Sequence, residues 1–160
     1  MRVALVTRPI DAAALLREVA STAHGATSLF LGTVREVNEG REVSGIEYAA
    51  YAAMATAELE RIAREALARF GVGALVVEHR TGVLELGDVS VAIAAAHAHR
   101  SPALDATRHV IEELKKRVPI WKREHYADGT REWIDPTSLP SPVSSLPSAS
   151  TSLPSPSGLG

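Results

Sequence analysis

The sequence contains no cysteine, and aromatic side chains make up only 4% of its 160 residues. Without cysteine the chain cannot form a disulfide, a thiolate metal site or a cysteine nucleophile. No apolar run approaches the roughly 18 residues that suggest a membrane-spanning helix. Arg8, Pro9 and Asp11 interrupt the amino-terminal segment where a signal peptide would carry its apolar stretch. We therefore expect a soluble, cytoplasmic protein.

The chain also lacks an excess of charge of either sign, since its formal net charge is −2. A protein that binds polyanions in general would be expected to carry a basic excess, so any basic patch here is a local arrangement. The hydrophobic fraction of 46% and the charged fraction of 22% are typical of one globular domain with a real core.

The composition changes abruptly after Pro136. Residues 137–160 hold five of the nine prolines and no charged residue. Such a Pro/Ser-rich segment cannot bury enough apolar surface to offset the entropy lost on ordering, which predicts a disordered tail. The alternative is a polyproline ligand for a partner domain, although no basic residue flanks the prolines. The folded domain is expected over residues 1–136.

Within that domain, strands and helices without regular βαβ alternation predict the α+β class. Asp11 and Ser101 are the expected helix N-caps, with Pro102 at a favourable first position, and Pro119 is expected to end the last helix. Hydrophobic periodicity predicts helices over 11–23, 55–70 and 101–117, strands over 26–34, 44–51, 74–82 and 88–99, and a polar loop over 35–42.

The stretch ELKKRVPIWKRE (113–124) places five basic side chains, a proline and a tryptophan in twelve positions. Lys115 falls in the last turn of the helix, one turn after Ile111 and at the border of the apolar stripe, and Lys122 lies beyond Pro119. Neighbouring positive charges lower a lysine pKa and favour the nucleophilic amine, whereas the helix C-terminus favours the cation. The alternative is a solvated helix end that complements the helix dipole, although the Pro-Ile-Trp insertion argues against it.

The segment HAHR (97–100) is a second candidate site. On a strand, His97 and His99 would point to the same face, as a metal pair requires, but the sequence shows no evident third ligand. His99, Arg100 and the N-terminus of the following helix are also suited to hold an anion such as phosphate. A structural strand end explains the same residues.

The segment FLGTVRE (30–36) is a third candidate. Arg35 follows a predicted buried strand close to Gly32, where glycine permits a close backbone approach. An arginine at this point can fork to a carboxylate or phosphate, or it can simply pair with a nearby glutamate at the surface.

These three segments, with IEYAAYAAM (46–54) and EHRTGVLELGDVSVAIAAAHAHR (78–100), resemble in the same order the catalytic (large) subunit family of molybdopterin synthase. The resemblance covers about residues 1–136 and leaves the tail out. One departure is Ile120, which stands where the family pattern has an aromatic residue. The resemblance implies an α/β-hammerhead fold with a mixed or antiparallel sheet and flanking helices. It also implies a central homodimer that carries one small subunit at each end, a heterotetramer.

The family makes the dithiolene of molybdopterin by inserting two sulfur atoms into cyclic pyranopterin monophosphate, a step of molybdenum cofactor biosynthesis. The resemblance implies that sulfur arrives as a thiocarboxylate on the Gly-Gly tail of a small ubiquitin-like subunit. This fits a chain that has no cysteine to carry sulfur itself. We expect this sulfurtransferase to need no cofactor and no metal of its own.

Site roles follow from the same resemblance. Lys115 matches the essential lysine, as general acid/base or transient acyl acceptor, and Lys122 matches the lysine that holds substrate or stabilises negative charge. Arg35 matches an arginine of the same pocket. His99 and Arg100 match the pair that binds the substrate phosphate across the dimer interface. The alternative is a non-catalytic module that docks a ubiquitin-like tail or a phosphorylated ligand; acidic neighbours and few aromatics argue against a nucleic-acid binder.

Overall fold

The structure is a computed structural model, and it describes residues 1–134. These residues form three helices and nine strands, the α+β class that the sequence predicts. The helices are α1 (Ala12–Val19), α2 (Ala52–Phe70) and α3 (Arg100–Arg117). The strands are β1 (Arg2–Val6), β2 (Ala26–Thr33), β3 (Val37–Asn38), β4 (Arg41–Ala50), β5 (Ala74–Arg80), β6 (Gly82–Leu84), β7 (Val89–His97), β8 (Ile120–Tyr126) and β9 (Arg131–Ile134). The predicted disordered tail, 137–160, lies outside the described residues, as do the last two residues of the predicted domain 1–136.

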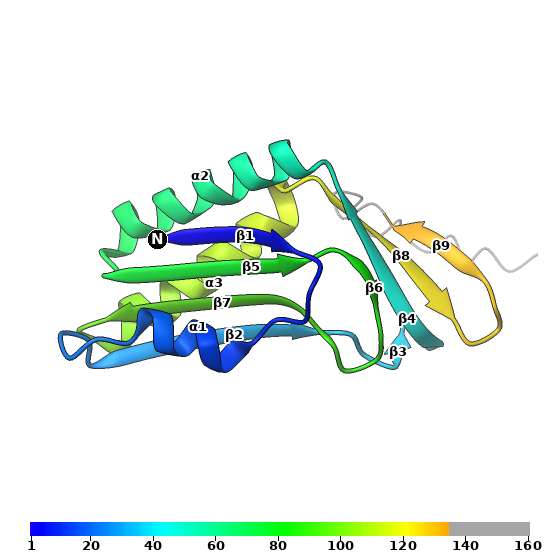
Figure 1. Ribbon diagram of the computed structural model, residues 1–160, viewed down its shortest axis with the longest axis horizontal. Coiled ribbons are helices and arrows are strands. Elements are labelled where there is room, and N and C mark those ends of the chain that lie inside the picture. Colours follow the sequence, from blue (N-terminus) through cyan, green and yellow to red (C-terminus); the bar gives the residue numbers. More distant parts are fainter. Residues whose placement is uncertain (135–160) are drawn as a thin grey trace, which may run out of the picture.

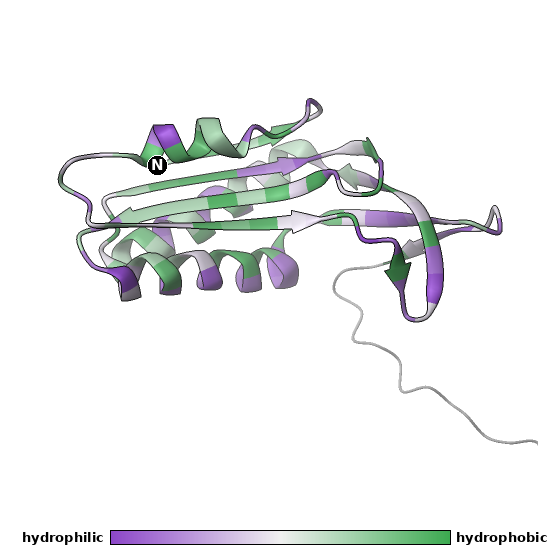
Figure 2. Ribbon diagram, turned by 90° about the horizontal axis from the view of Figure 1, so that it is seen from below, coloured by the Kyte–Doolittle hydropathy of each residue, from purple (hydrophilic) through white to green (hydrophobic). Residues whose placement is uncertain are grey.

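The first sheet has four strands in the order β1-β5-β7-β2, with β1 parallel to β5 and the other pairs antiparallel (Figure 1). Helices α2 and α3 pack on one face and α1 packs on the other (Figure 2). Strand β7 is buried on both faces, with Val91 and Ile93 toward α2 and α3, and Ala92 and Ala94 toward α1. Burial on both sides explains why this strand reads as a continuous apolar run.

The second sheet has five strands in the order β3-β4-β8-β9, with β6 paired to β4. It stands at the right of the first sheet in Figure 1. Strand β4 leads directly into α2, and β8 follows α3, so both long helices meet this sheet at one end of the molecule. A small core of Val34, Val43, Ile46, Leu84 and Tyr126 lies at this junction.

The helix ends agree with the sequence at most points. Asp11 caps α1, its carboxylate accepting a hydrogen bond from the backbone N–H of Ala14 at 3.0 Å. Gly71 ends α2 in the left-handed conformation, at φ 64°. Helix α1, however, ends at Val19, four residues before its predicted end. Helix α3 ends at Arg117, as Pro119 predicts.

The predicted N-cap of α3 is wrong. His99, not Ser101, is the last extended residue before the helix, at φ −122° and ψ 151°, and its side chain makes no capping bond. Strand β7 ends at His97, and a connection of two residues is enough to start the helix, so Ser101 already lies inside the first turn. Pro102 is tolerated there because the first N–H groups of a helix have no intrahelical acceptor.

The predicted polar loop over 35–42 is also wrong, because a short hairpin occupies it. Val37 pairs with Glu42, and Asn38 pairs with Arg41. The two turn residues between them, Glu39 and Gly40, both have positive φ, 49° and 79°. Positive φ at both central residues is the mark of the type I′ turn that joins antiparallel strands.

No described helix is long and apolar enough to cross a membrane.

Candidate active site

A cavity of about 720 Å³ lies where α3 ends, between the two sheets. Its volume is within the range of about 300–1,000 Å³ usual for small-molecule sites. Lys115, Lys122 and Arg35 all line it, although they are far apart in the sequence. The apolar part of the wall consists of Phe30, Val43, Ile46, Tyr48, Val91, Ile111, Leu114, Val118, Ile120 and Ile134.

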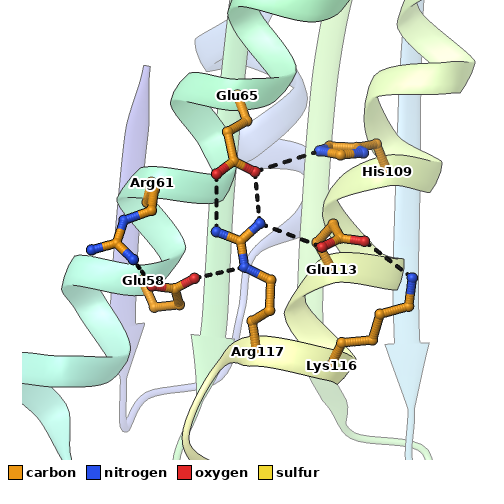
Figure 3. A network of polar contacts seen from close by, with 7 residues as sticks. All are labelled: Glu58, Arg61, Glu65, His109, Glu113, Lys116 and Arg117. Carbon is orange, nitrogen blue, oxygen red and sulfur yellow. Dashed lines mark hydrogen bonds and ion pairs between the residues drawn. The ribbon is translucent and has the colours of Figure 1, made fainter.

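Arg117 does not line this cavity but ties α3 to α2, as Figure 3 shows. Its guanidinium donates two hydrogen bonds to Glu65, at 2.7 and 2.9 Å, one to Glu58 at 2.7 Å and one to Glu113 at 3.3 Å. The hydrogen bonds from Arg117 hold the pKa of Glu65 below its ordinary value. Lys116 in turn pairs with Glu113 at 3.1 Å. The positive charge that the sequence gathers around Lys115 is therefore largely offset by carboxylates.

Lys115 differs from the other basic residues of the stretch 113–124. Arg123 pairs with Glu47 and Lys122 pairs with Glu124, just as Lys116 and Arg117 pair with glutamates of α2 and α3. Within residues 1–134, Lys115 alone of the five has neither an ion pair nor a hydrogen bond through its ammonium group. It is exposed at the cavity, on the last turn of α3. An amine in this position is available to a ligand.

Lys122 and Arg35 belong to one chain of hydrogen bonds that has a buried carboxylate at its centre. Glu124 is 1% exposed and accepts hydrogen bonds from Nζ of Lys122 at 2.9 Å and from the hydroxyl of Tyr126 at 2.7 Å. The side-chain amide of Asn38 also donates to Glu124, at 3.0 and 2.8 Å. The oxygen of the same amide accepts from the guanidinium of Arg35 at 2.5 Å.

The charge state of Glu124 follows from these contacts. Burial alone raises the pKa of a carboxyl, but the hydrogen bonds from Tyr126, Lys122 and Asn38 outweigh it and hold the pKa of Glu124 below its ordinary value. Burial, together with the hydrogen bond to Glu124, raises the pKa of Tyr126 to about 12. The network at neutral pH therefore consists of an ionised carboxylate, a neutral phenol and two cations.

His79 adds a neutral group to the cavity wall. It is 5% exposed, and its ring nitrogen Nδ1 lies 3.0 Å from the carbonyl oxygen of Arg80, so this nitrogen carries the proton and donates it. Burial lowers the pKa of His79 to about 4. The rings of Tyr48 and His79 form a T-shaped pair, with 5.1 Å between their centroids. His79 is thus an uncharged part of the wall at neutral pH.

His99 and Arg100 lie elsewhere in the chain, at the opposite end of α3. Sixteen residues separate His99 from Lys115, which is about 24 Å along a helix. The rings of His97 and His99 have centroids 5.8 Å apart, and Nδ1 of His97 accepts a hydrogen bond from the backbone N–H of His99 at 2.9 Å. In residues 1–134, no group of three or more His, Cys, Asp or Glu side chains is placed to hold a metal ion.

Comparison with known proteins relates this arrangement to one family. Residues 5–117 match the family model described as MoaE protein. The chain belongs to the MoaE family. It is 42% identical over 141 residues to the molybdopterin synthase catalytic subunit of Oryza sativa subsp. indica, an alignment that covers 85% of this chain and 73% of the relative. It is 41% identical over 139 residues to the protein of the same name from Pyrococcus abyssi, covering 84% and 91%.

A solved structure agrees with the MoaE assignment. The crystal structure of molybdopterin synthase from Staphylococcus aureus matches with a TM-score of 0.77 and 33% sequence identity, over 82% of this chain and 95% of that chain. The family match runs from β1 to the end of α3 and so includes Arg35 and Lys115. Lys122 lies five residues beyond it, in β8.

Ile120, where the sequence analysis expected an aromatic residue, forms part of the cavity wall. Ile120 is the first residue of β8, pairs with Ala50 and is 5% exposed. Its side chain packs in the main core and lines the cavity. An aliphatic residue at this position therefore still provides an apolar contact.

Sequence reasoning missed Asn38, Glu124 and Tyr126 as members of the site. One signal was present for Glu124: in a strand, residues two apart point to the same face, so a strand over 120–126 places Glu124 beside Lys122. Asn38 gave no such signal, because its neighbour Glu124 is 86 residues away in the sequence.

Proposed function

We propose that this chain is the catalytic subunit of a molybdopterin synthase, a sulfurtransferase of molybdenum cofactor biosynthesis. It would form the dithiolene of molybdopterin from cyclic pyranopterin monophosphate and the thiocarboxylated tail of a small ubiquitin-like subunit. The relatives from Oryza sativa and Pyrococcus abyssi carry the name catalytic subunit, which implies a further subunit. The observation that carries the proposal is Lys115, a lysine without a carboxylate partner among the described residues, at the cavity of a MoaE-family chain.

The chemistry requires two events at one acyl group. The thiocarboxylate sulfur forms a bond to a substrate carbon while a bond from that carbon to oxygen breaks. The bond between that sulfur and the acyl carbon then breaks, and the sulfur stays on the substrate as a thiolate. In our proposal Lys115 serves the second event. Its neutral amine either attacks the acyl carbon, forming a transient amide with the small subunit, or takes a proton from a water that does so. Water restores the carboxylate in both cases.

The other cations of the cavity serve binding and charge stabilisation. The substrate phosphate and the thiocarboxylate are both anionic, so fixed positive charges lower the cost of bringing them together. We assign this role to Arg35 and Lys122. Lys122 is half-buried beside Glu124, and so its ammonium group is held in one place before substrate arrives.

His99 and Arg100 enter the proposal through a second protomer. Because His99 lies about 24 Å along α3 from Lys115, the pair and Lys115 meet in one site only when two chains combine. We propose a homodimer in which the His99 and Arg100 of one protomer hold the substrate phosphate at the cavity of its partner. A cytoplasmic location belongs to the same proposal, and cell fractionation tests it.

A reconstituted reaction tests the proposed function. The full-length protein is mixed with cyclic pyranopterin monophosphate and a thiocarboxylated small subunit, and molybdopterin is detected as its oxidised, fluorescent derivative. The same mixture with a small subunit that ends in a plain carboxylate is the control. We expect product only with the thiocarboxylate. Binding of the small subunit without product would instead support the non-catalytic docking module.

A further inference from the structure

Asn38 occupies a place in the cavity that the roles given above leave unexplained. It is the last residue of β3, it is half-buried, and the turn at Glu39 and Gly40 follows it directly. Its amide oxygen faces the guanidinium of Arg35, and its amide nitrogen faces both oxygens of Glu124. The side chain therefore lies between a cation and an anion.

Only an amide satisfies both of these neighbours at once. The side chain of asparagine presents an acceptor oxygen and a donor nitrogen from one rigid plane. An aspartate has the same shape but two acceptor oxygens, so one of them would face the carboxylate of Glu124 as a like charge. An alanine would leave the guanidinium of Arg35 without its acceptor and Glu124 without one of its donors.

Glu124 connects Asn38 to the second cation of the cavity. Its oxygen Oε1 accepts from both Lys122 and Asn38, at 2.9 and 3.0 Å, and Oε2 accepts from Tyr126 and Asn38, at 2.7 and 2.8 Å. Four hydrogen bonds on a carboxylate that is 1% exposed fix its orientation, and a fixed carboxylate fixes Lys122. A side chain of β3 is thus linked to a lysine of β8.

We propose that Asn38 is a positioning residue of the sulfur-transfer site. It holds Arg35 directly, and it holds Lys122 through Glu124. The inference rests on the proposed function, because it assigns Asn38 to the same reaction. Asn38 does not act on the reacting atoms. It sets the separation of two cations that receive the anionic substrates, and small errors in such a separation reduce the rate more than they reduce binding of the partner.

The charged and titratable groups near Asn38 define what pH can change there. Arg35, Glu124, Lys122 and Tyr126 form the network itself. The other such groups that line the cavity are Glu39, Tyr48, His79 and Lys115. Two carboxyl groups in contact tend to share one proton, so in Asn38→Asp one of the pair takes up a proton at a higher pH than an isolated carboxyl. The protonated group can then donate to its neighbour, as the amide does.

The test compares Asn38→Asp, Asn38→Ala and wild type in the reconstituted sulfur transfer between pH 6 and pH 8. The matched control is Ala57→Asp, which adds the same charge to an exposed position of α2, outside the cavity lining. For Asn38→Asp we expect kcat to be roughly tenfold lower than that of wild type at pH 8, because about one buried hydrogen bond is lost. The KM for the small subunit should change little. This deficit should shrink toward pH 6, whereas the deficit of Asn38→Ala should stay constant. Ala57→Asp should match wild type.

Two results would overturn the inference. One is an Asn38→Asp variant with the kcat of wild type at pH 8. The other is a deficit of the same size at every pH, which indicates general damage to the fold.

Melting temperatures keep the test independent of the proposed reaction. If wild type makes no molybdopterin, the proposed function fails, but the contacts of Asn38 still predict that Asn38→Asp loses more thermal stability at pH 8 than at pH 6. Equal melting temperatures of Asn38→Asp and wild type at both pH values would then contradict the placement of Asn38.

Discussion

Replacing Glu124 by glutamine tests the buried network beneath the cavity. Glu124 is 1% exposed and serves three donors, Lys122, Tyr126 and Asn38. Glutamine keeps the size of the side chain but offers one acceptor oxygen to these donors and brings an NH₂ group of its own against them. At least one buried donor then lacks an acceptor, at a cost of about 1–3 kcal/mol, and the remaining bonds lose their charge assistance, for about 1 kcal/mol more. We expect the free energy of unfolding to fall by about 3 kcal/mol at pH 7.

Thermal unfolding followed by circular dichroism measures this loss. For a folded domain of this size, about 3 kcal/mol corresponds to a melting temperature lower by about 10 °C. The matched control is Glu132→Gln. Glu132 lies opposite Glu124 in the register of β8 and β9, but its side chain is 54% exposed and pairs with Arg41 at the surface. We expect that variant to melt close to wild type, because exposed ion pairs contribute little. Equal melting temperatures for the two variants would refute the reasoning.

The pH dependence of the same difference has a definite sign. The pKa of Glu124 is lower in the folded protein than its ordinary value. As the pH falls, the unfolded chain therefore binds a proton at this residue before the folded protein does. The stabilisation by Glu124 is complete above the ordinary carboxyl range and is lost as the pH falls through the folded value. The gap between wild type and Glu124→Gln should consequently narrow in acid.

Two further predictions concern groups around the cavity. Arg117→Leu removes the contacts that tie α3 to α2, and it should lower the melting temperature by about 5 °C. The control, Arg64→Leu, loses one exposed ion pair with Glu60 and should melt close to wild type. Equal effects of the two substitutions would contradict the role of Arg117. His79 has a pKa of about 4 against an ordinary 6.5, so the unfolded chain binds its proton first and stability falls as the pH drops from about 6.5 to about 4. The free energy of unfolding, measured in urea, should fall less between pH 7 and pH 5 for His79→Phe than for wild type. A fall of the same size in both proteins would contradict a buried, neutral imidazole at this position.

The elements with strong periodicity could be predicted from the sequence. Helix α2 carries a long apolar stripe that packs against one face of the first sheet. Strand β7 carries a continuous apolar run that is buried on both faces of that sheet. The hairpin of β3 and β4 could not be predicted this way, because its turn is Glu39-Gly40 rather than the Asn-Gly pair that usually marks such a turn. No strand could be predicted over residues 120–134, since β8 shows no regular alternation of apolar and polar side chains and its strand partner β4 is distant in the sequence.

The basic residues of the candidate site could be predicted from the sequence, but the carboxylates around them could not. Lys115, Lys122 and Arg35 were candidates from the residues themselves, their roles came from the resemblance to a family, and the fold brings all three to one cavity. The pairing of Arg117 with Glu58 and Glu65 depends on how α2 packs against α3, which no local pattern contains. This pairing, with those of Lys116, Lys122 and Arg123, distinguishes Lys115 from its basic neighbours. Sequence alone shows five basic residues, whereas the structure leaves one of them without a partner in residues 1–134.

The most direct test of the central claim compares Lys115→Ala with Lys116→Ala in single-turnover sulfur transfer. Both lysines lie in the last turn of α3, but Lys116 pairs with Glu113 and Lys115 faces the cavity. If Lys115 acts as general acid/base or acyl acceptor, Lys115→Ala should lower the rate by about a hundredfold or more while the small subunit still binds. Lys116→Ala should transfer sulfur at nearly the rate of wild type. Equal rates for the two variants would contradict the account.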